Sequence, residues 1–319
     1  MSTHGVVSKS GVELAYDARA DGATAAVLLA LLETIEANLE GAIADVDIEM
    51  LHDFRVAVRR SRAVQRELKR VFPPEPLARF RSEFRSLQLA TGEARDLDVH
   101  VDEFESLRTI VPEETRGDLD PLLTVLGSRR LIARRTMARA LRSRRTAALL
   151  SEWSAFLGEL PSLPEDDRPD AGSPIGAVAG RRIVRVYRRI VRMGRSIGPS
   201  SPAEPYHELR KQGKELRYLL ELFAAPMYPR EVVGPMIKAL KALQDVLGRH
   251  QDREVQIAML HRLADDVADL PGGPDALMAM GVLAERLAED QLEARSEFTE
   301  RFDVFASKHQ RALVRKTFA

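Results

Sequence analysis

Two segments of the chain place one histidine and three basic residues at the same spacing. The first basic row is His52, Arg55, Arg59 and Arg62, and the second basic row is His207, Arg210, Lys214 and Arg217. On an α-helix these positions fall within an arc of roughly 80°, so each row occupies one helix face. Stacked like charges repel each other, and a helix tolerates them when carboxylates face the row or an anion binds it. Arginine forks and histidine N–H groups suit phosphate oxygens, so the rows indicate a polyanion-binding surface.

The two rows belong to an internal repeat. The second row follows the first by 155 positions, and a motif beginning at Leu87-Gln88 recurs at Leu243-Gln244, shifted by 156. Two motifs in the same order at nearly the same shift predict a duplication of one large unit. Within the second motif, Asp96 and Asp252 could cap helices after turns at the preceding glycines, or orient an arginine. The two glutamines could bind ligand or cap a neighbouring helix.

Further basic residues extend the two rows. Arg85 and Lys241 coincide in the repeat, and Arg60 and Lys211 stand beside the rows. A third series, here called the arginine track, has 4-3-4-3 spacing and consists of Arg181, Arg185, Arg188, Arg192 and Arg195. The matching helix of the first copy, near residues 26–40, has no basic residue, so we expect one lopsided basic cavity. The arginines between 129 and 145 spread around their helix and indicate a solvated surface, which is also the alternative interpretation of the track.

The composition limits the fold class and the chemistry. Of 319 residues 45% are hydrophobic but only 5% aromatic, which favours a helical core of Ala, Leu, Val and Ile. The absence of cysteine excludes disulfides, zinc–thiolate sites and cysteine nucleophiles. No apolar run approaches the roughly 20 residues of a membrane span, and no signal peptide is evident, so we expect a cytoplasmic protein without a membrane partner. The zero net charge hides an excess of arginine, 40 of the 48 basic residues.

Hydrophobic periodicity predicts helices throughout and almost no strands. Helices are expected over residues 24–39, 49–72, 77–90, 97–109, 120–143 and 145–159, and again over 177–196, 203–225, 230–247, 252–268 and 274–316. The Pro-, Gly- and Asp-rich segment between them marks a connection. The predicted organisation is a lead-in at 1–22, a first half at 23–160, a linker at 161–176 and a second half at 177–319.

The repeated motifs resemble a known family. HDFRVAVRRSR followed by LATGEARDLDV, and HELRKQGKELRYLLELF followed by LQDVLGRHQD, resemble the CHAD family (conserved histidine α-helical domain), over about residues 24–316. The resemblance implies an all-α fold of two tandem four-helix bundles, related by a pseudo-twofold axis, with basic helices around a central cavity. It also implies binding of inorganic polyphosphate, and association with polyphosphate granules in some members.

The predicted function is therefore non-enzymatic binding of inorganic polyphosphate. The predicted contact residues are His52, Arg55, Arg59, Arg60, Arg62, Arg85, Arg181, Arg185, Arg188, Arg192, His207, Arg210, Lys211, Lys214, Arg217 and Lys241. No clustered carboxylates accompany the rows, so neither a metal site nor a catalytic residue nor a cofactor is predicted. The few aromatics do not favour single-stranded nucleic acid, which stacks on them.

Three points stay open at this stage. An enzyme of phosphate anhydrides, or a phosphotransfer protein with His52 or His207 as acceptor, is the alternative from another class. A scaffold that docks an acidic protein is a third possibility. The oligomeric state is not predicted.

Overall fold

The protein is all-helical, as predicted. The computed structural model describes residues 11–198 and 200–318, and within them no strand forms beyond one isolated bridge between Arg19 and Pro174. The first half contains α1 (Ala20–Ala44), α2 (Ile48–Glu67), α3 (Pro74–Ala90), α4 (Gly92–Asp102), α5 (Phe104–Arg108), α6 (Asp120–Leu141) and α7 (Arg144–Glu159). The second half contains α8 (Ile175–Arg195), α9 (Ala203–Leu219), α10 (Ala225–Met227), α11 (Arg230–Ala268), α12 (Gly273–Phe305) and α13 (Lys308–Phe318).

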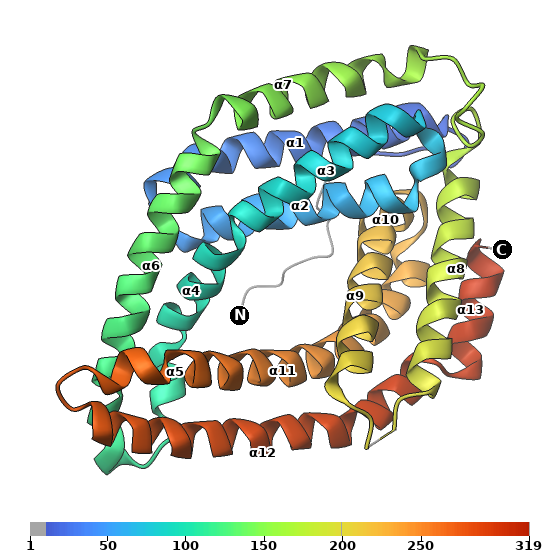
Figure 1. The fold of residues 1–319 in the computed structure, drawn as a ribbon. Helices are drawn as coiled ribbons and strands as arrows, with labels where there is room; N and C mark the ends of the chain where they lie inside the picture. The colour runs from blue at the N-terminus through green and yellow to red at the C-terminus, as the bar shows by residue number, and fades with distance from the viewer. Residues whose placement is uncertain (1–10, 199, 319) are drawn as a thin grey trace.

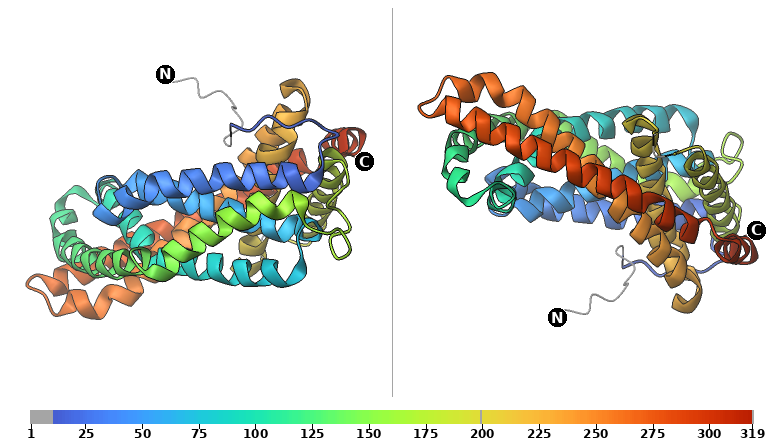
Figure 2. Two further views of the ribbon diagram at one scale, coloured as in Figure 1. Left: turned by 90° about the horizontal axis from the view of Figure 1, so that it is seen from above. Right: turned by 90° about the horizontal axis from the view of Figure 1, so that it is seen from below.

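The helices form the four sides of a frame (Figure 1). The first side holds α1, α2, α3 and α7, the second α4 and α6, the third α11 and α12, and the fourth α8, α9 and α13. The view from below in Figure 2 shows α12 running alongside α11. One continuous hydrophobic core joins both halves, and α6 packs against α11 and α12 across the predicted boundary. Two separate four-helix bundles therefore stay a prediction.

One predicted helix break does not exist in the second half. Helix α11 continues through Gly248, where the sequence suggested a turn, so Asp252 lies inside a helix and caps nothing. Asp96 likewise lies inside α4, which begins at Gly92. The halves differ because the Thr91 hydroxyl donates to the Leu87 carbonyl oxygen (3.2 Å) where α3 ends, whereas the equivalent Leu247 is apolar and buried.

The lead-in and the linker pack against each other. The amide nitrogens of Ile175 and Gly176 donate to the carbonyl oxygens of Ala18 (2.8 Å) and Tyr16 (2.9 Å). Arg168, fully buried in the linker, donates to the carbonyl oxygens of Pro164 (2.8 Å) and Leu160 (2.9 Å). The linker is thus an ordered part of the fold, and α1 begins at Ala20, three residues before the predicted boundary. Residues 1–10 of the predicted lead-in (1–22) lie outside the described residues.

Helix α1 corrects the expectation about membrane-length segments. By length and hydropathy it is apolar enough to cross a membrane, with a mean hydropathy of 1.4 over its best window. A core helix meets the same criterion, and α1 packs against α2, α6 and α7.

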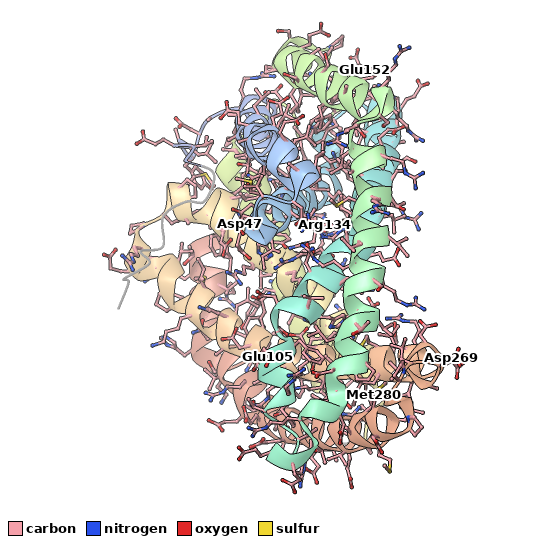
Figure 3. The ribbon with its side chains drawn as sticks, turned by 90° about the vertical axis from the view of Figure 1, so that its left-hand side faces the viewer. Asp47, Glu105, Arg134, Glu152, Asp269 and Met280 are labelled. Carbon is pink, nitrogen blue, oxygen red and sulfur yellow. The ribbon has the colours of Figure 1, made fainter. Side chains whose placement is uncertain are left out.

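Figure 3 labels Arg134 where α1, α4 and α6 meet. This buried arginine pairs with Asp98 of α4 and donates to the Ala42 carbonyl oxygen (3.2 Å). It therefore stabilises the junction of α6 with α1. The expectation that the arginines between 129 and 145 form a solvated surface was wrong for Arg134.

Two ion pairs join the halves where α2 meets α9. Arg60 bonds Glu221 (Nη2–Oε2, 2.6 Å), and Arg66 bonds Glu215 (Nη2–Oε1, 2.8 Å). At the repeat shift of 155, Arg60 corresponds to Glu215 and Arg66 to Glu221. The pairing is therefore crossed, as in a twofold contact where residue i meets j and j meets i. Since one copy is basic here and the other acidic, the repeated helices attract each other instead of repelling.

We expect the buried pair to show a large energetic coupling. Arg60 and Glu221 are 7% and 10% exposed, so Arg60→Met leaves the buried Glu221 with Arg217 alone and should lower the free energy of unfolding by about 2 kcal/mol, as for the loss of one charged hydrogen bond. The double variant Arg60→Met/Glu221→Leu should recover most of that loss, measured by urea denaturation. Arg66→Met is the matched control because Arg66 is 40% exposed, and about 1 kcal/mol or less is expected. Equal losses for the two single variants would contradict this role of the buried pair.

Candidate functional site

A cavity of about 900 Å³ lies among α2, α5, α9 and α11. These helices lie on the inner side of the frame in Figure 1. Seven cationic side chains line it: Arg59, Arg60, Arg210, Lys214, Arg217, Arg249 and Arg253. The other charged or titratable groups of the lining are Glu103, Asp245, Asp252, His52 and Tyr218. Positive charge therefore exceeds negative charge in this lining, with contributions from both copies of the repeat.

Most of the cavity arginines already have carboxylate partners. Arg217 donates to Glu221 (Nε–Oε1, 2.6 Å), which also holds Arg60, and Arg210 donates to Asp252 (Nη2–Oδ1, 3.3 Å). Arg249 bonds Glu297 (2.7 Å), and Arg253 bonds Asp290. Asp252 thus orients an arginine, which was one of the two roles predicted for it. These pairs hold the guanidinium groups at the cavity wall.

Arg59 and Lys214 differ from the other cavity cations. Within residues 11–198 and 200–318 neither has an ion pair, and the buried Arg59 Nε has no hydrogen-bond partner. Burial, followed by the charges of Arg210 and Arg59, lowers the pKa of Lys214 to about 8. The first and second basic rows therefore meet at these two side chains. An anion between them would supply the missing opposite charge.

Arg55 and Arg62, of the first basic row, turn away from the cavity lining. Arg55 is buried and donates through Nη1 to the Thr91 hydroxyl (2.8 Å) and the Gln88 carbonyl oxygen (3.0 Å). Burial and the nearby Arg59 charge lower the pKa of Arg55 to about 10. Arg62 donates to the side-chain oxygen of Gln88. Both arginines therefore fasten α2 to the end of α3, and Gln88 is the partner of an arginine and no helix cap.

Equivalent glycines adjoin equivalent arginines in the two halves. A Cβ atom on Gly92 would lie 3.8 Å from Arg55 Nη1, and one on Gly248 would lie 4.0 Å from Arg210 Nη2. The repeated Arg–Gly pair is thus a helix–helix contact that occurs twice. Gly213 also lies at a close contact between helices, because a Cβ there would lie 3.5 Å from Gln244 Cγ on α11.

The two repeated histidines are held in different tautomers. Arg95 Nη2 lies 3.1 Å from His52 Nδ1, and arginine can only donate, so His52 carries its proton on Nε2. Burial, followed by the Arg95 charge, lowers the pKa of His52. His207 Nδ1 faces the oxygen of Gln251, whose amide nitrogen donates to Glu254 (3.2 Å), so this ring donates from Nδ1. His52 lines the cavity with a donor free on Nε2, whereas His207 is absent from the lining.

The remaining predicted contact residues lie outside this cavity lining. Arg85, Lys211 and Lys241 are exposed, and Lys211 pairs with Glu208 on its own helix. Four arginines of the track were predicted to contact the ligand, and none of them contributes to the lining: Arg181, Arg185, Arg188 and Arg192. They are exposed along α8, which lies between α9 and α13 at the outer edge of the frame in Figure 1. The expectation that the track reinforces the cavity was therefore wrong, because another face of α8 packs on α9.

The family assignment follows from comparison with known proteins. The sequence model of the CHAD domain family matches residues 26–261 of this chain, from α1 into α11. The chain belongs to the CHAD family. The crystal structure of the CHAD domain from the plant Ricinus communis is similar with a TM-score of 0.69 and 24% identity, covering 95% of this chain and 94% of that chain. PptA from Streptomyces chartreusis has a TM-score of 0.67 and 17% identity, covering 90% and 100%. These two likenesses show a shared fold, and comparison with curated proteins gave no match.

Several cavity residues of this CHAD chain escaped the sequence analysis. Arg249 and Arg253 line the cavity from α11, but their counterparts in the first copy are Glu93 and Leu97, so the repeat gave no signal. Their i, i+4 spacing on one helix face was the only feature of the sequence that could have indicated them. Glu103 was missed because it is a single acid at a helix end. Within the described residues, no group of three or more His, Asp or Glu side chains could hold a metal ion.

We expect the histidine tautomers to be visible in solution. Long-range ¹H–¹⁵N correlation spectra near neutral pH should show His52 protonated on Nε2 and His207 protonated on Nδ1, since Arg95 and the Gln251 side-chain oxygen impose opposite requirements. Arg95→Met should release the His52 ring and leave the His207 signals unchanged. The same tautomer mixture at both rings in the unmodified protein would contradict the assignment.

Proposed function

We propose that this protein binds inorganic polyphosphate in the cavity, without catalysing a reaction on it. The observation that carries the proposal is the meeting of Arg59 and Lys214, one from each copy, without carboxylate partners in the described residues. Placing two half-buried cations next to each other without a paired carboxylate is unfavourable unless an anion binds there. His52 adds a neutral N–H donor at the same wall. Membership of the CHAD family supports the choice of polyphosphate.

A linear polyanion suits this arrangement better than a single small anion. The cationic side chains come from three helices, α2, α9 and α11, and are spread around the cavity. Polyphosphate carries about one negative charge per phosphate, so one chain can pair with several of them in turn and release the counterions that it carries, as nucleic acids do. Arginines held by Glu221 and Asp252 are already oriented and lose little side-chain freedom on binding. We expect cytoplasmic polyphosphate, including granules, to be the physiological ligand.

The hydrogen bonds of His52, the repeated histidine that lines the cavity, do not favour phosphotransfer to it. A phosphoacceptor nitrogen needs a free lone pair, but His52 Nδ1 accepts from Arg95 and its Nε2 carries the proton. A metal-assisted cleavage of anhydride bonds would need carboxylates gathered around an ion, and the described part of the chain offers no such group. Binding without chemistry therefore accounts for more of the arrangement than either catalytic alternative.

The cavity cations can be tested by neutral substitutions. Arg59→Gln and Lys214→Gln should each weaken binding of a short polyphosphate by about tenfold or more, because each removes a charged hydrogen bond of about 1.5 kcal/mol or more. Each should also lower the slope of log K against log salt by about one, measured by calorimetric titration at several salt concentrations.

Arg85→Gln is the matched control for these variants. It removes the same charge from an exposed site outside the cavity lining, so binding of the short chain should change by less than about twofold. Full affinity in the double variant Arg59→Gln/Lys214→Gln would overturn the proposed site. Release of phosphate with magnesium present would overturn the non-enzymatic assignment.

The lowered pKa of Lys214 predicts a pH dependence. With a pKa of about 8 in the free protein, Lys214 is mostly charged at pH 7 and mostly neutral at pH 9. Since an anion binds the charged form, affinity should fall by up to about tenfold between these pH values, and protons should be taken up on binding. Lys214→Arg stays charged and should bind with little change over this range. An equal fall for the wild type and Lys214→Arg would show that another group causes it.

A further inference from the structure

A second groove rich in arginine lies between α8 and α13. It has a volume of about 580 Å³, and its charged lining consists of Arg188, Arg192, Arg195, Arg311 and Arg315. No acidic side chain contributes to this lining, in contrast to the cavity described above. Val184, Val191 and Val314 form its apolar floor. The groove therefore concentrates positive charge on a surface separate from the cavity.

The groove gathers five arginines without carboxylate partners in the described chain around one concavity, whereas several exposed arginines elsewhere are paired. Arg129 pairs with Asp266, Arg145 pairs with Glu83 and Arg286 pairs with Glu289. None of the five groove arginines has a carboxylate partner among residues 11–198 and 200–318, and Arg311 only reaches the Ser307 carbonyl oxygen (3.4 Å). Like charges spaced three and four residues apart destabilise a helix by themselves. An external anion would relieve that repulsion.

The geometry favours a linear polyanion as the occupant. The arginine track from Arg181 to Arg195 extends roughly 21 Å along α8 at 1.5 Å per residue, and α13 adds two arginines beside its end. A flexible chain with a charge on every unit can pair with arginines at any spacing, whereas an acidic helix would need carboxylates in matching register. The apolar floor supports the hydrocarbon stems of the arginines and leaves their guanidinium groups in water.

From these observations we infer that the α8–α13 groove is a second polyphosphate site, which binds a distant part of the same long chain that occupies the cavity. This inference rests on the proposed function. The track and the cavity lie on different sides of the α8–α9 layer, so a short polyphosphate occupies one of them and a long one engages both. Joining two sites by one chain raises the affinity through the effective concentration of the second segment.

The test compares polyphosphates of two lengths on matched variants. The groove variant Arg188→Gln/Arg192→Gln/Arg311→Gln should bind a short fraction of about eight phosphates in the cavity as the wild type does, since it keeps every residue of the cavity lining. It should bind long-chain polyphosphate at least about tenfold more weakly than the wild type, because the second contact is lost.

The control variant Arg129→Gln/Arg145→Gln/Arg286→Gln removes the same number of charges from exposed arginines that have carboxylate partners. It should keep the wild-type affinity for both lengths. Thermal unfolding of all variants, followed by circular dichroism, shows that each retains its fold.

The two proposals fail in different ways. Wild-type affinity of the groove variant for long chains, or the same loss in the control variant, would overturn the second site and leave the cavity untouched. An acidic amphipathic peptide that binds the wild type and not the groove variant, while long polyphosphate binds both equally, would assign the groove to a protein partner and overturn the inference. Unchanged short-chain affinity in Arg59→Gln/Lys214→Gln would overturn the cavity site, and with it the bridging of two sites by one chain, while the groove variant still reports separately on the groove.

Discussion

The contact between α2 and α9 determines where the basic residues of the two rows lie relative to one another. Two helices with similar basic rows would repel each other, but the second copy carries Glu215 and Glu221 where the first carries Arg60 and Arg66. The resulting crossed ion pairs, at 2.6 and 2.8 Å, bring the helices together across a twofold-like contact. Removing one buried partner is costly, so this arrangement is strongly maintained. It also sets Arg59 and Lys214 close enough for the charge of one to lower the pKa of the other.

The residues around this contact between α2 and α9 also show that the repeated halves are not equivalent. Arg217 shares Glu221 with Arg60 and stays at the cavity wall, whereas its counterpart Arg62 bonds Gln88 and leaves the lining. His52 lines the cavity with its Nδ1 bonded to Arg95, whereas His207 bonds Gln251 and lies outside the lining. The duplication gives two copies of one helix face, and after divergence one part of each face lines the cavity while another part holds the fold together.

Part of the site could be predicted and part could not. The repeat singled out Arg59, Arg210 and Lys214 without any structural information, because their spacing on one helix face is a local property. An arc of roughly 80° is wide enough for Arg55 to face α3 while Arg59 faces the cavity, and only the neighbouring helices decide between these. Arg249 and Arg253 were missed because the first copy has no basic residue at the equivalent positions.

The sequence by itself determined the all-α class, the duplication, the family resemblance and the basic helix faces, since periodicity and spacing are local and repeat along the chain. The tertiary structure alone decided where those faces point. The track on α8 has the predicted spacing, yet it lies outside the cavity because another face of that helix packs on α9. Whether an arginine is paired with a carboxylate also depends on residues more than a hundred positions away, as Arg60 and Glu221 show. Contacts between distant segments have no periodic signature, and so the proposed anion-binding surface could be recognised only in the folded structure.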